Sequence, residues 1–177
     1  LLAHMAGDEA MIAAFRSGGD FHAETAAKVF HVAPDQVTHE MRRQAKAVNF
    51  GIVYGISAFS LSQDIGVSVA EAKAYMEAYF ATFPGVRTYM DAIVERAREQ
   101  GYVETLFHRR RDLPELKSSN FNLRSFGERV ALNMPIQGTA ADIIKLAMIA
   151  VEKRLREGLP EARLVLQVHD ELIVECP

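Results

Sequence analysis

The sequence predicts an α+β fold that is mostly helical and has a small antiparallel β portion. Three observations predict it. Apolar residues recur at helical spacing through most of the 177-residue chain. They alternate with polar residues only in residues 102–107 and 162–175, where turn residues interrupt the pattern. Hydrophobic residues make up 49% of the chain, which is enough for a packed core.

The first part of the chain is predicted to form a series of helices with short breaks between them. Asp20 is placed to cap the start of one helix. Ser68 and Glu71 are three residues apart, which is the pattern of a capping box. Pro84 begins a further helix after a break. The sequence therefore predicts helices at residues 2–16, 21–30, 38–54, 68–83 and 84–100.

The second part of the chain mixes extended and helical patterns. Residues 102–107 favour a hairpin or extended arm whose tip carries a basic run. Helical periodicity returns near Arg124, breaks at Pro135, resumes at Ala140 and ends near Gly158. The last stretch is predicted to be a strand, a tight turn and a second strand.

Composition limits the kinds of partner. No apolar run approaches the roughly 20 residues of a membrane span, and no signal-peptide pattern is present, so no membrane partner is expected. Cys176 is the only cysteine, which favours a reducing compartment. The net charge is −3, yet the segment from Thr105 to Phe126 is basic, which suits one oriented contact with a polyanion. The basic residues of this segment are Arg109, Arg110, Arg111, Lys117 and Arg124.

Two cations and two aromatic residues follow one another at intervals of four: Arg42, Lys46, Phe50 and Tyr54. On a helix each step of four advances about 40°, so the side chains form one stripe about 18 Å long. A nucleotide lying along the stripe would meet His22 or the two cations with its phosphates and the two rings with its other end. The alternative is a solvated helix face with a core Phe.

A second stripe is formed by Arg129, Asn133 and Gln137. Its simplest interpretation is a polar helix face. The functional alternative is contact with the minor groove, where every base pair presents acceptors, so these donors would detect pairing without reading sequence.

The turn near the end of the chain places Asp170 and Glu171 next to each other. Acidic residues are common in turns, so a purely structural role is one interpretation. The other is a Mg²⁺ site, because Mg²⁺ prefers one or two carboxylates together with substrate phosphates. His169 is either a strand residue or a donor to the terminus of a nucleic-acid strand.

Together these stretches resemble the polymerase domain of family A DNA polymerases, the bacterial DNA polymerase I type. The segment "RRQAKAVNFGIVYG" is similar to motif B, the nucleotide-binding helix of the fingers subdomain, and "VHDE" is similar to motif C of the palm subdomain. The resemblance runs from end to end and in matching order. It is also carried by "DFHAETAAKVF", "GYVETL", "RRRDLPELKSSN" and "NMPIQGTAADIIKLAMIAVEKRL".

The resemblance implies that residues 1–177 are part of a palm and fingers domain, truncated at both ends. Residues from about 20 to 100 would belong to the fingers, and those from about 101 to 177 to a palm portion with the motif C hairpin. The implied parent is a cytoplasmic, monomeric, DNA-directed DNA polymerase of replication and repair. Its implied partners are primer–template DNA and deoxynucleoside triphosphates, and its implied cofactor is Mg²⁺, with two ions in the complete enzyme.

The resemblance also implies a role for each matching nucleotide-site residue. His22, Arg42 and Lys46 would bind the incoming triphosphate. Lys46 would also give a proton to the leaving pyrophosphate. Phe50 and Tyr54 would flank the sugar and the templating site.

Other roles concern the DNA and the metal. Asp170 would be the catalytic metal ligand, and Glu171 a weaker supporting candidate. The residues expected to contact the minor groove of the primer–template are Arg129, Asn133, Gln137 and His169.

One departure from the family pattern concerns the second metal-binding aspartate, which belongs to motif A and is expected a few residues before Leu1. Without it, this chain alone is expected to be inactive. The main alternative is a non-catalytic, nucleic-acid-binding relative of the polymerases. A weaker alternative is a metal-dependent nuclease built on Asp170 and Glu171, which leaves the nucleotide stripe unexplained.

Overall fold

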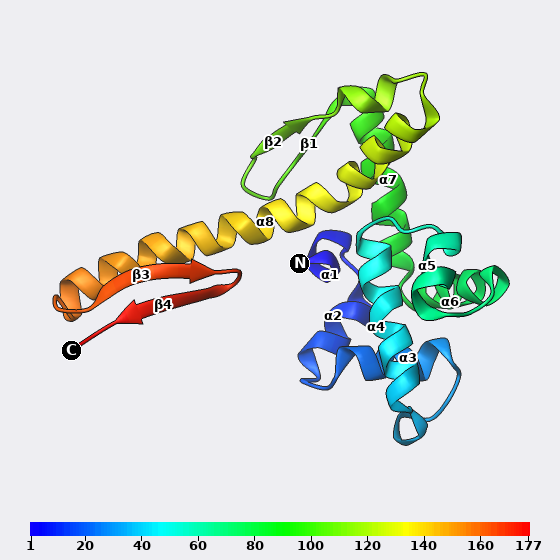
Figure 1. The fold of residues 1–177 in the computed structure, drawn as a ribbon, viewed down its shortest axis with the longest axis horizontal. Helices are drawn as coiled ribbons and strands as arrows, with labels where there is room; N and C mark the ends of the chain where they lie inside the picture. Colours follow the sequence, from blue (N-terminus) through cyan, green and yellow to red (C-terminus); the bar gives the residue numbers. More distant parts are fainter.

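A computed structural model describes all 177 residues and confirms the α+β prediction. Figure 1 shows a body of helices from which one long helix, α8 (Phe121–Gly158), extends with a hairpin of strands β3 (Arg163–Val168) and β4 (Glu171–Glu175) beside its far half. The body contains α1 (Leu2–Ala6), α2 (Glu9–Arg16), α3 (Phe21–Val29), α4 (His39–Val53), α5 (Ala58–Ile65), α6 (Val69–Thr82) and α7 (Pro84–Gln100), with a 3₁₀ turn, η1, at Pro34–Gln36.

Side-chain caps mark the starts of α3, α4 and α6, where the sequence predicts that helices begin. The Ser68 hydroxyl accepts from the Glu71 backbone N–H while the Glu71 carboxylate accepts from the Ser68 N–H, which confirms the capping box. Thr38 caps α4 by accepting from Met41 N–H. Such caps each contribute about 1 kcal/mol to helix stability, so they locate helix starts without help from packing.

Two parts of the helix prediction were wrong. The single helix expected at residues 2–16 is two helices, because Gly7 adopts a left-handed conformation with φ of 59° and Asp8 caps a new helix. Helix α5 was not predicted at all. Its start is marked by Ser57, whose hydroxyl accepts from Ser60 N–H.

The predicted break at Pro135 is also wrong, because α8 continues through it. Proline lacks the N–H that would bond to the carbonyl of Ala131, and its ring crowds that carbonyl, at a cost of about 3 kcal/mol. Pro135 is fully buried, as is Ala131, so packing offsets the lost hydrogen bond.

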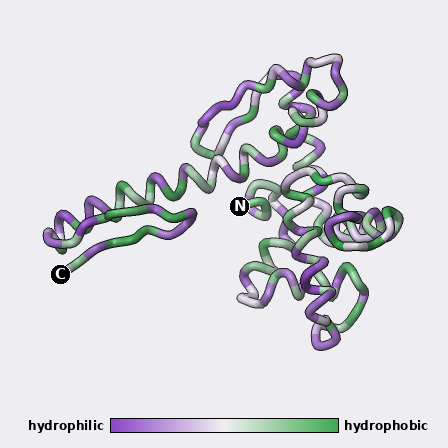
Figure 2. Tube along the Cα trace, viewed as in Figure 1, coloured by the Kyte–Doolittle hydropathy of each residue, from purple (hydrophilic) through white to green (hydrophobic).

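The uninterrupted α8 changes the expectation about membranes. The sequence prediction divided this segment at Pro135 into two shorter helices. As one helix, α8 is long and apolar enough to cross a bilayer by length and composition. One such helix is weak evidence, because soluble proteins contain helices that meet the same criteria. Figure 2 shows apolar stretches along the far half of α8 and along the hairpin, where several large apolar side chains are exposed. These are Ile143, Leu146, Ile149, Val165, Leu166 and Ile173.

Both β elements are antiparallel hairpins. Strands β1 (Tyr102–Glu104) and β2 (Arg110–Asp112) pair with Tyr102 opposite Asp112. This arm docks on α8, where the buried Thr139 hydroxyl accepts from Leu106 N–H at 3.0 Å. Strands β3 and β4 pair with Val168 opposite Glu171, and their register shifts between Leu164 and Leu166.

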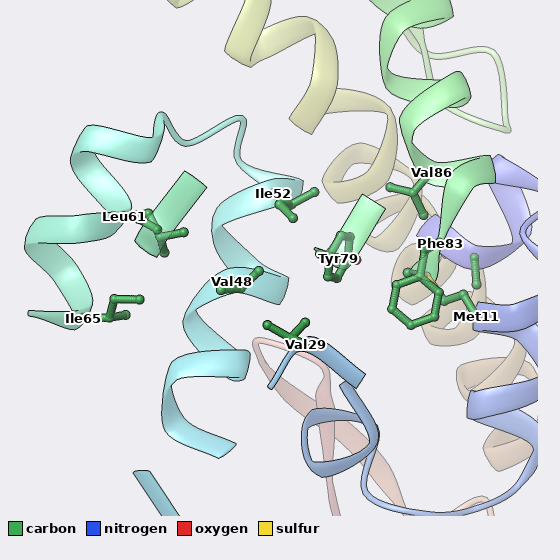
Figure 3. Close-up of a cluster of buried hydrophobic side chains, with 11 residues drawn as sticks. Met11, Val29, Val48, Ile52, Leu61, Ile65, Tyr79, Phe83 and Val86 are labelled. Atoms are coloured by element: carbon green, nitrogen blue, oxygen red, sulfur yellow. The ribbon is translucent and has the colours of Figure 1, made fainter. Parts of the chain in front are cut away.

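The main core lies behind α4. Val48 and Ile52 are almost fully buried against side chains of α2, α3, α5, α6 and α7, among them Tyr79 and Phe83, as Figure 3 shows. Burying each aliphatic side chain contributes about 1.5–3 kcal/mol. A second cluster, which includes Ile93, packs α7 and the β1–β2 arm onto α8. The cores therefore hold α4 and the first half of α8 as fixed supports for the site.

Candidate functional site

Helix α4 presents the predicted stripe to the outside. Its inward face is fully buried at Ala45, Val48 and Ile52. On the outward side, Phe50 and Tyr54 are 49% and 47% exposed. Rings this exposed are outside the core, so the core interpretation of Phe50 is wrong. The functional roles of the stripe stay predictions.

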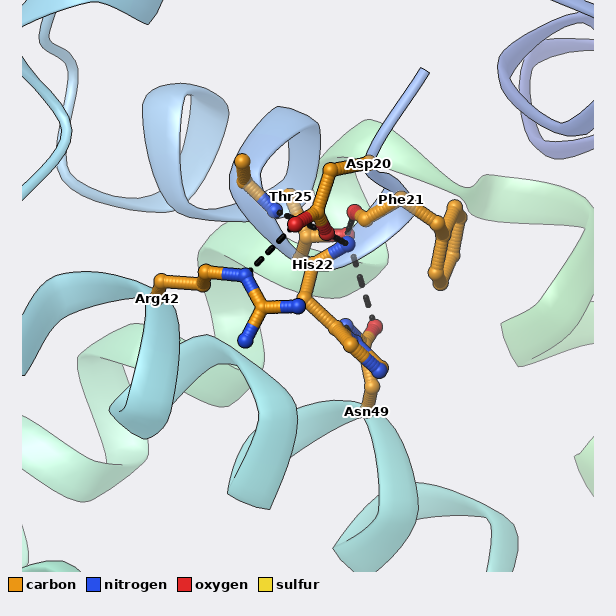
Figure 4. A network of polar contacts seen from close by, with 7 residues as sticks. Asp20, Phe21, His22, Thr25, Arg42 and Asn49 are labelled. Atoms are coloured by element: carbon orange, nitrogen blue, oxygen red, sulfur yellow. Dashed lines mark hydrogen bonds and ion pairs between the residues drawn. The ribbon is translucent and has the colours of Figure 1, made fainter. Parts of the chain in front are cut away.

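Asp20 and Arg42 join the start of α3 to the start of α4. The Arg42 Nε lies 2.6 Å from Asp20 Oδ2, as Figure 4 shows. The other carboxylate oxygen accepts from the backbone N–H groups of His22 and Ala23 and so caps α3. The hydrogen bond from Arg42 lowers the pKa of Asp20 the most. Desolvation opposes it, and the backbone hydrogen bonds and the charge of Arg42 lower the pKa further. Asp20 therefore holds Arg42 in place.

The His22 ring sits beside the cations of α4. Its Nδ1 lies 3.0 Å from the Asn49 side-chain Nδ2, and its ring centroid lies 5.9 Å from that of Phe50. Burial lowers the pKa of His22, the Asp20 carboxylate opposes this, and the charges of Arg42 and Lys46 lower the pKa further. The ring is therefore held in the neutral form more than a free histidine would be.

Lys46 completes a group of basic side chains. Its Nζ lies 5.9 Å from the centroid of the Phe50 ring, and no carboxylate lies within ion-pairing distance of it. The structure thus brings His22, Arg42, Lys46 and Phe50 together at one side of α4. Clustered cations of this kind attract phosphate groups.

A groove of about 1120 Å³ separates the end of α4 from the first half of α8. The two rings of the first predicted stripe line it, together with the whole of the second stripe: Phe50, Tyr54, Arg129, Asn133 and Gln137. The Gln137 side-chain Nε2 donates to the Tyr54 hydroxyl at 2.8 Å. The Asn133 Nδ2 is buried and has no protein partner. The groove therefore carries free donor capacity on the α8 side.

Gly55 allows the two helices to come close. Its φ is 67°, a conformation that side chains rarely adopt, and an added Cβ would lie 2.9 Å from Leu132 Cδ1. The neighbours of this added Cβ, Leu132 and Arg129, both belong to α8, so α8 is the element that approaches the backbone here.

The basic run on the β1–β2 arm is partly neutralised within the chain. Arg109 pairs with Asp142 of α8, and Arg110 pairs with Asp112 and lies 3.8 Å above the Tyr102 ring. Arg111 instead lines the groove. The arm thus offers fewer free cations than the sequence suggests, and one of them joins the site.

The structure keeps the acidic turn apart from the groove. His169 has a left-handed φ of 52° at the β3–β4 turn, and Glu171 begins β4. The turn is at the end of the hairpin nearer the helical body (Figure 1). No hydrogen bond or ion pair links His169, Asp170 or Glu171 to α3, α4 or α8.

The donors at this turn fit Mg²⁺ in kind. Asp170 and Glu171 are exposed carboxylates without an ion-pair partner, and Mg²⁺ typically takes one or two carboxylates besides phosphates and water. No group of three or more His, Cys, Asp or Glu side chains is placed to hold a metal ion. The turn thus offers two carboxylates of the kind that Mg²⁺ binds.

Sequence reasoning missed Asn49, Thr25 and Arg111 as neighbours of the site. Asn49 could have been noticed, because it is a polar residue between Val48 and Ile52 on the predicted buried face of a helix. The position of Arg111 depends on how the arm docks, which no local pattern encodes.

Comparisons with known proteins agree over the whole chain. A sequence model of the family described as "DNA polymerase family A" matches residues 1–177. DNA polymerase I of Geobacillus stearothermophilus is 60% identical over 177 residues, and that of Bacillus subtilis (strain 168) is 58% identical over 177 residues. Both alignments cover 100% of this chain and 20% of the relative, so the chain spans about a fifth of their length.

A solved structure shares the fold. It is described as the POL domain of Pol1 from M. smegmatis in complex with DNA primer-template and dNTP. It superimposes with a TM-score of 0.93 at 48% sequence identity, covering 99% of this chain and 31% of that chain.

Proposed function

The chain belongs to DNA polymerase family A, and from this membership we propose that its parent protein is a template-dependent DNA polymerase. It would add deoxynucleotides to the 3′ end of a primer. The observation that carries the proposal is one groove lined by the rings of the first stripe and by the whole second stripe, with the group of His22, Arg42 and Lys46 beside Phe50. The solved relative with primer–template and nucleotide supports the same partners.

The cationic cluster would bind the triphosphate. His22, Arg42 and Lys46 lie on one side of α4 and offer N–H donors to phosphate oxygens. Arg42 would exchange the Asp20 carboxylate for a phosphate oxygen as the nucleotide binds. Lys46 has no competing carboxylate, so its ammonium is free to donate a proton to the leaving pyrophosphate.

The groove would hold the base pair being formed. Phe50 would pack against the sugar, and Tyr54 would border the templating position. Arg129, the unpartnered Asn133 amide and Gln137 would donate to minor-groove acceptors that all correct pairs share. His169 would contact the primer end. These contacts would test base pairing without reading sequence.

Asp170 would hold Mg²⁺, with Glu171 in support. Such ions stabilise the attacking and leaving oxygens of an in-line displacement and need carboxylates on both sides of the reacting phosphorus. In this proposal Asp170 and Glu171 serve one side, and the aspartate expected for the other side would precede Leu1; no group of three ligands is placed to hold a metal ion. We therefore expect that residues 1–177 alone do not extend a primer. In this proposal α3 to α7 belong to the fingers, and α8 with the hairpins belongs to the palm.

The test is primer extension with the complete parental chain, run beside the 177-residue chain, with template, Mg²⁺ and all four nucleotides. The parent should give template-dependent products, and Asp170→Asn should abolish them. DNA binding without extension by the parent would instead support a non-catalytic relative. Products from the 177-residue chain would show that the metal site has been misplaced.

A further inference from the structure

Asn49 is a buried amide on the inner side of α4, with 6% of its surface exposed. It follows Val48 and precedes Gly51 and Ile52, all of them buried. A buried amide is retained at little cost only when its donors and acceptor find partners. The partner of its Nδ2 is the His22 ring Nδ1 at 3.0 Å, which belongs to another helix.

The other end of the amide faces Thr25. The Asn49 Oδ1 lies 3.5 Å from the Thr25 Oγ1, and both residues are buried. The Thr25 hydroxyl has one proton and two possible acceptors, the Asn49 Oδ1 and the Phe21 carbonyl at 2.8 Å, and it can give the proton to Phe21. Its oxygen therefore keeps acceptor capacity toward Asn49.

We propose that Asn49 is a positioning residue that keeps the Nε2–H of His22 directed at the triphosphate whether the ring is neutral or protonated. The inference rests on the proposed function, in which His22 contacts the nucleotide phosphates. It assigns Asn49 no contact with the nucleotide itself.

When the ring is neutral, the Asn49 amide has the orientation of the structure in Figure 4, with Nδ2 toward His22. Asn49 Nδ2–H donates to His22 Nδ1, so the single ring proton resides on Nε2. When the ring is protonated, the Asn49 amide is flipped, so that Oδ1 faces His22 and Nδ2 faces Thr25. His22 Nδ1–H then donates to Oδ1, and Nδ2–H donates to the free acceptor of Thr25. The oxygen and nitrogen of an amide occupy nearly equivalent positions, so the exchange needs no movement of the helix.

Neither Asp nor Leu at position 49 would keep the Nε2–H of His22 directed at the triphosphate in both protonation states. A carboxylate at position 49 only accepts, so a neutral ring would carry its proton on Nδ1 and turn a lone pair toward the phosphates. A Leu at position 49 would leave the ring free to turn. The charged groups acting on the ring are Asp20 at the start of α3 and Arg42 and Lys46 on α4, and burial lowers its pKa. The neutral form is therefore the one that most needs the amide donor.

The experiment measures the affinity of the complete parental chain for dATP in the presence of Mg²⁺. The primer ends in a dideoxynucleotide, and the next template base is thymine. The pH is varied from about 6 to about 9, the range in which a histidine paired with a carboxylate titrates. For Asn49→Asp, the dissociation constant relative to wild type should rise roughly tenfold with increasing pH, as one hydrogen bond to phosphate is lost. For Asn49→Leu, it should be raised roughly three- to tenfold at every pH.

Two controls isolate the His22 contact. Gln44→Glu adds the same charge to α4 at a residue that bonds to Glu40, and it should bind dATP as wild type does. In a His22→Gln background, Asn49→Asp should add no pH dependence. A flat ratio in Asn49→Asp, or a slope that survives in the His22→Gln background, would overturn the proposal.

A second measurement separates this proposal from the proposed function. ¹⁵N NMR of histidine-labelled parental protein without nucleotide reports the tautomer of His22, whose signal is identified by its loss in His22→Gln. Neutral His22 should carry its proton on Nε2 in wild type and on Nδ1 in Asn49→Asp. The same tautomer in both proteins would refute the role of Asn49, whereas a wild-type parent that fails to incorporate dATP would refute only the polymerase.

Discussion

Gln137 donates a hydrogen bond from its side-chain Nε2 to the Tyr54 hydroxyl, 2.8 Å away and 83 residues earlier in the chain. This bond joins the end of α4 to α8 across the groove that both of them line. It shows that the aromatic end of one stripe and the polar stripe of α8 form the walls of one groove.

Tyr54→Phe should change incorporation by less than about tenfold, because it removes one exposed, neutral hydrogen bond and keeps the ring. Tyr54→Ala removes the ring that borders the proposed templating position and should cost more in both rate and discrimination. Single-nucleotide incorporation of matched and mismatched substrates by the complete parent measures both effects. Equal losses in the two variants would show that the hydroxyl bond, and not the ring, matters.

Lys46→Ala in the parent should slow incorporation by roughly 10²–10³-fold, the effect of losing about 3–4 kcal/mol of charged stabilisation in the transition state. DNA affinity should change far less. Single-turnover incorporation at saturating nucleotide is the measurement. Lys73→Ala is the matched control, since Lys73 is an exposed lysine on α6 with Glu77 as partner. A Lys46→Ala rate within a few-fold of wild type would reject the role.

Phe50→Tyr should increase the use of dideoxynucleotides. The Phe50 ring is about half exposed beside the cationic cluster and offers no hydrogen bond to replace a missing 3′-hydroxyl. A Tyr hydroxyl at this position could supply one. Competition between deoxy- and dideoxynucleotides in primer extension checks it, and unchanged discrimination would place Phe50 away from the sugar.

Gly55→Ala should destabilise the parent by about 1–3 kcal/mol, since the position has a positive φ and a Cβ would press on Leu132. The expected observation is a thermal midpoint lowered by a few degrees, together with weaker incorporation as α4 and α8 separate. Gly158→Ala is the control, because a Cβ there meets nothing within 4 Å. Equal midpoints for the two variants would contradict the proposed close approach.

Short-range signals in the sequence determined most of the helices and the orientation of α4. The Thr38 and Ser68 caps act within one helical turn, so they could be recognised without any tertiary structure. The spacing of four in the stripe of α4 likewise places its cations and rings on the side away from Val48 and Ile52. The α+β class followed from such patterns, whereas the family followed from the resemblance of whole segments such as "RRQAKAVNFGIVYG" and "VHDE".

The tertiary structure decided which of these features meet. Helix α8 continues through Pro135 because packing on the ring offsets a lost backbone bond, an effect that propensity does not contain. The Tyr54–Gln137 bond and the contact of Asn49 with His22 join residues distant in the chain, so they depend on how helices pack. Local sequence sets the hydrogen bonds within a turn of helix, whereas the partner of a buried or facing side chain is set by the whole core.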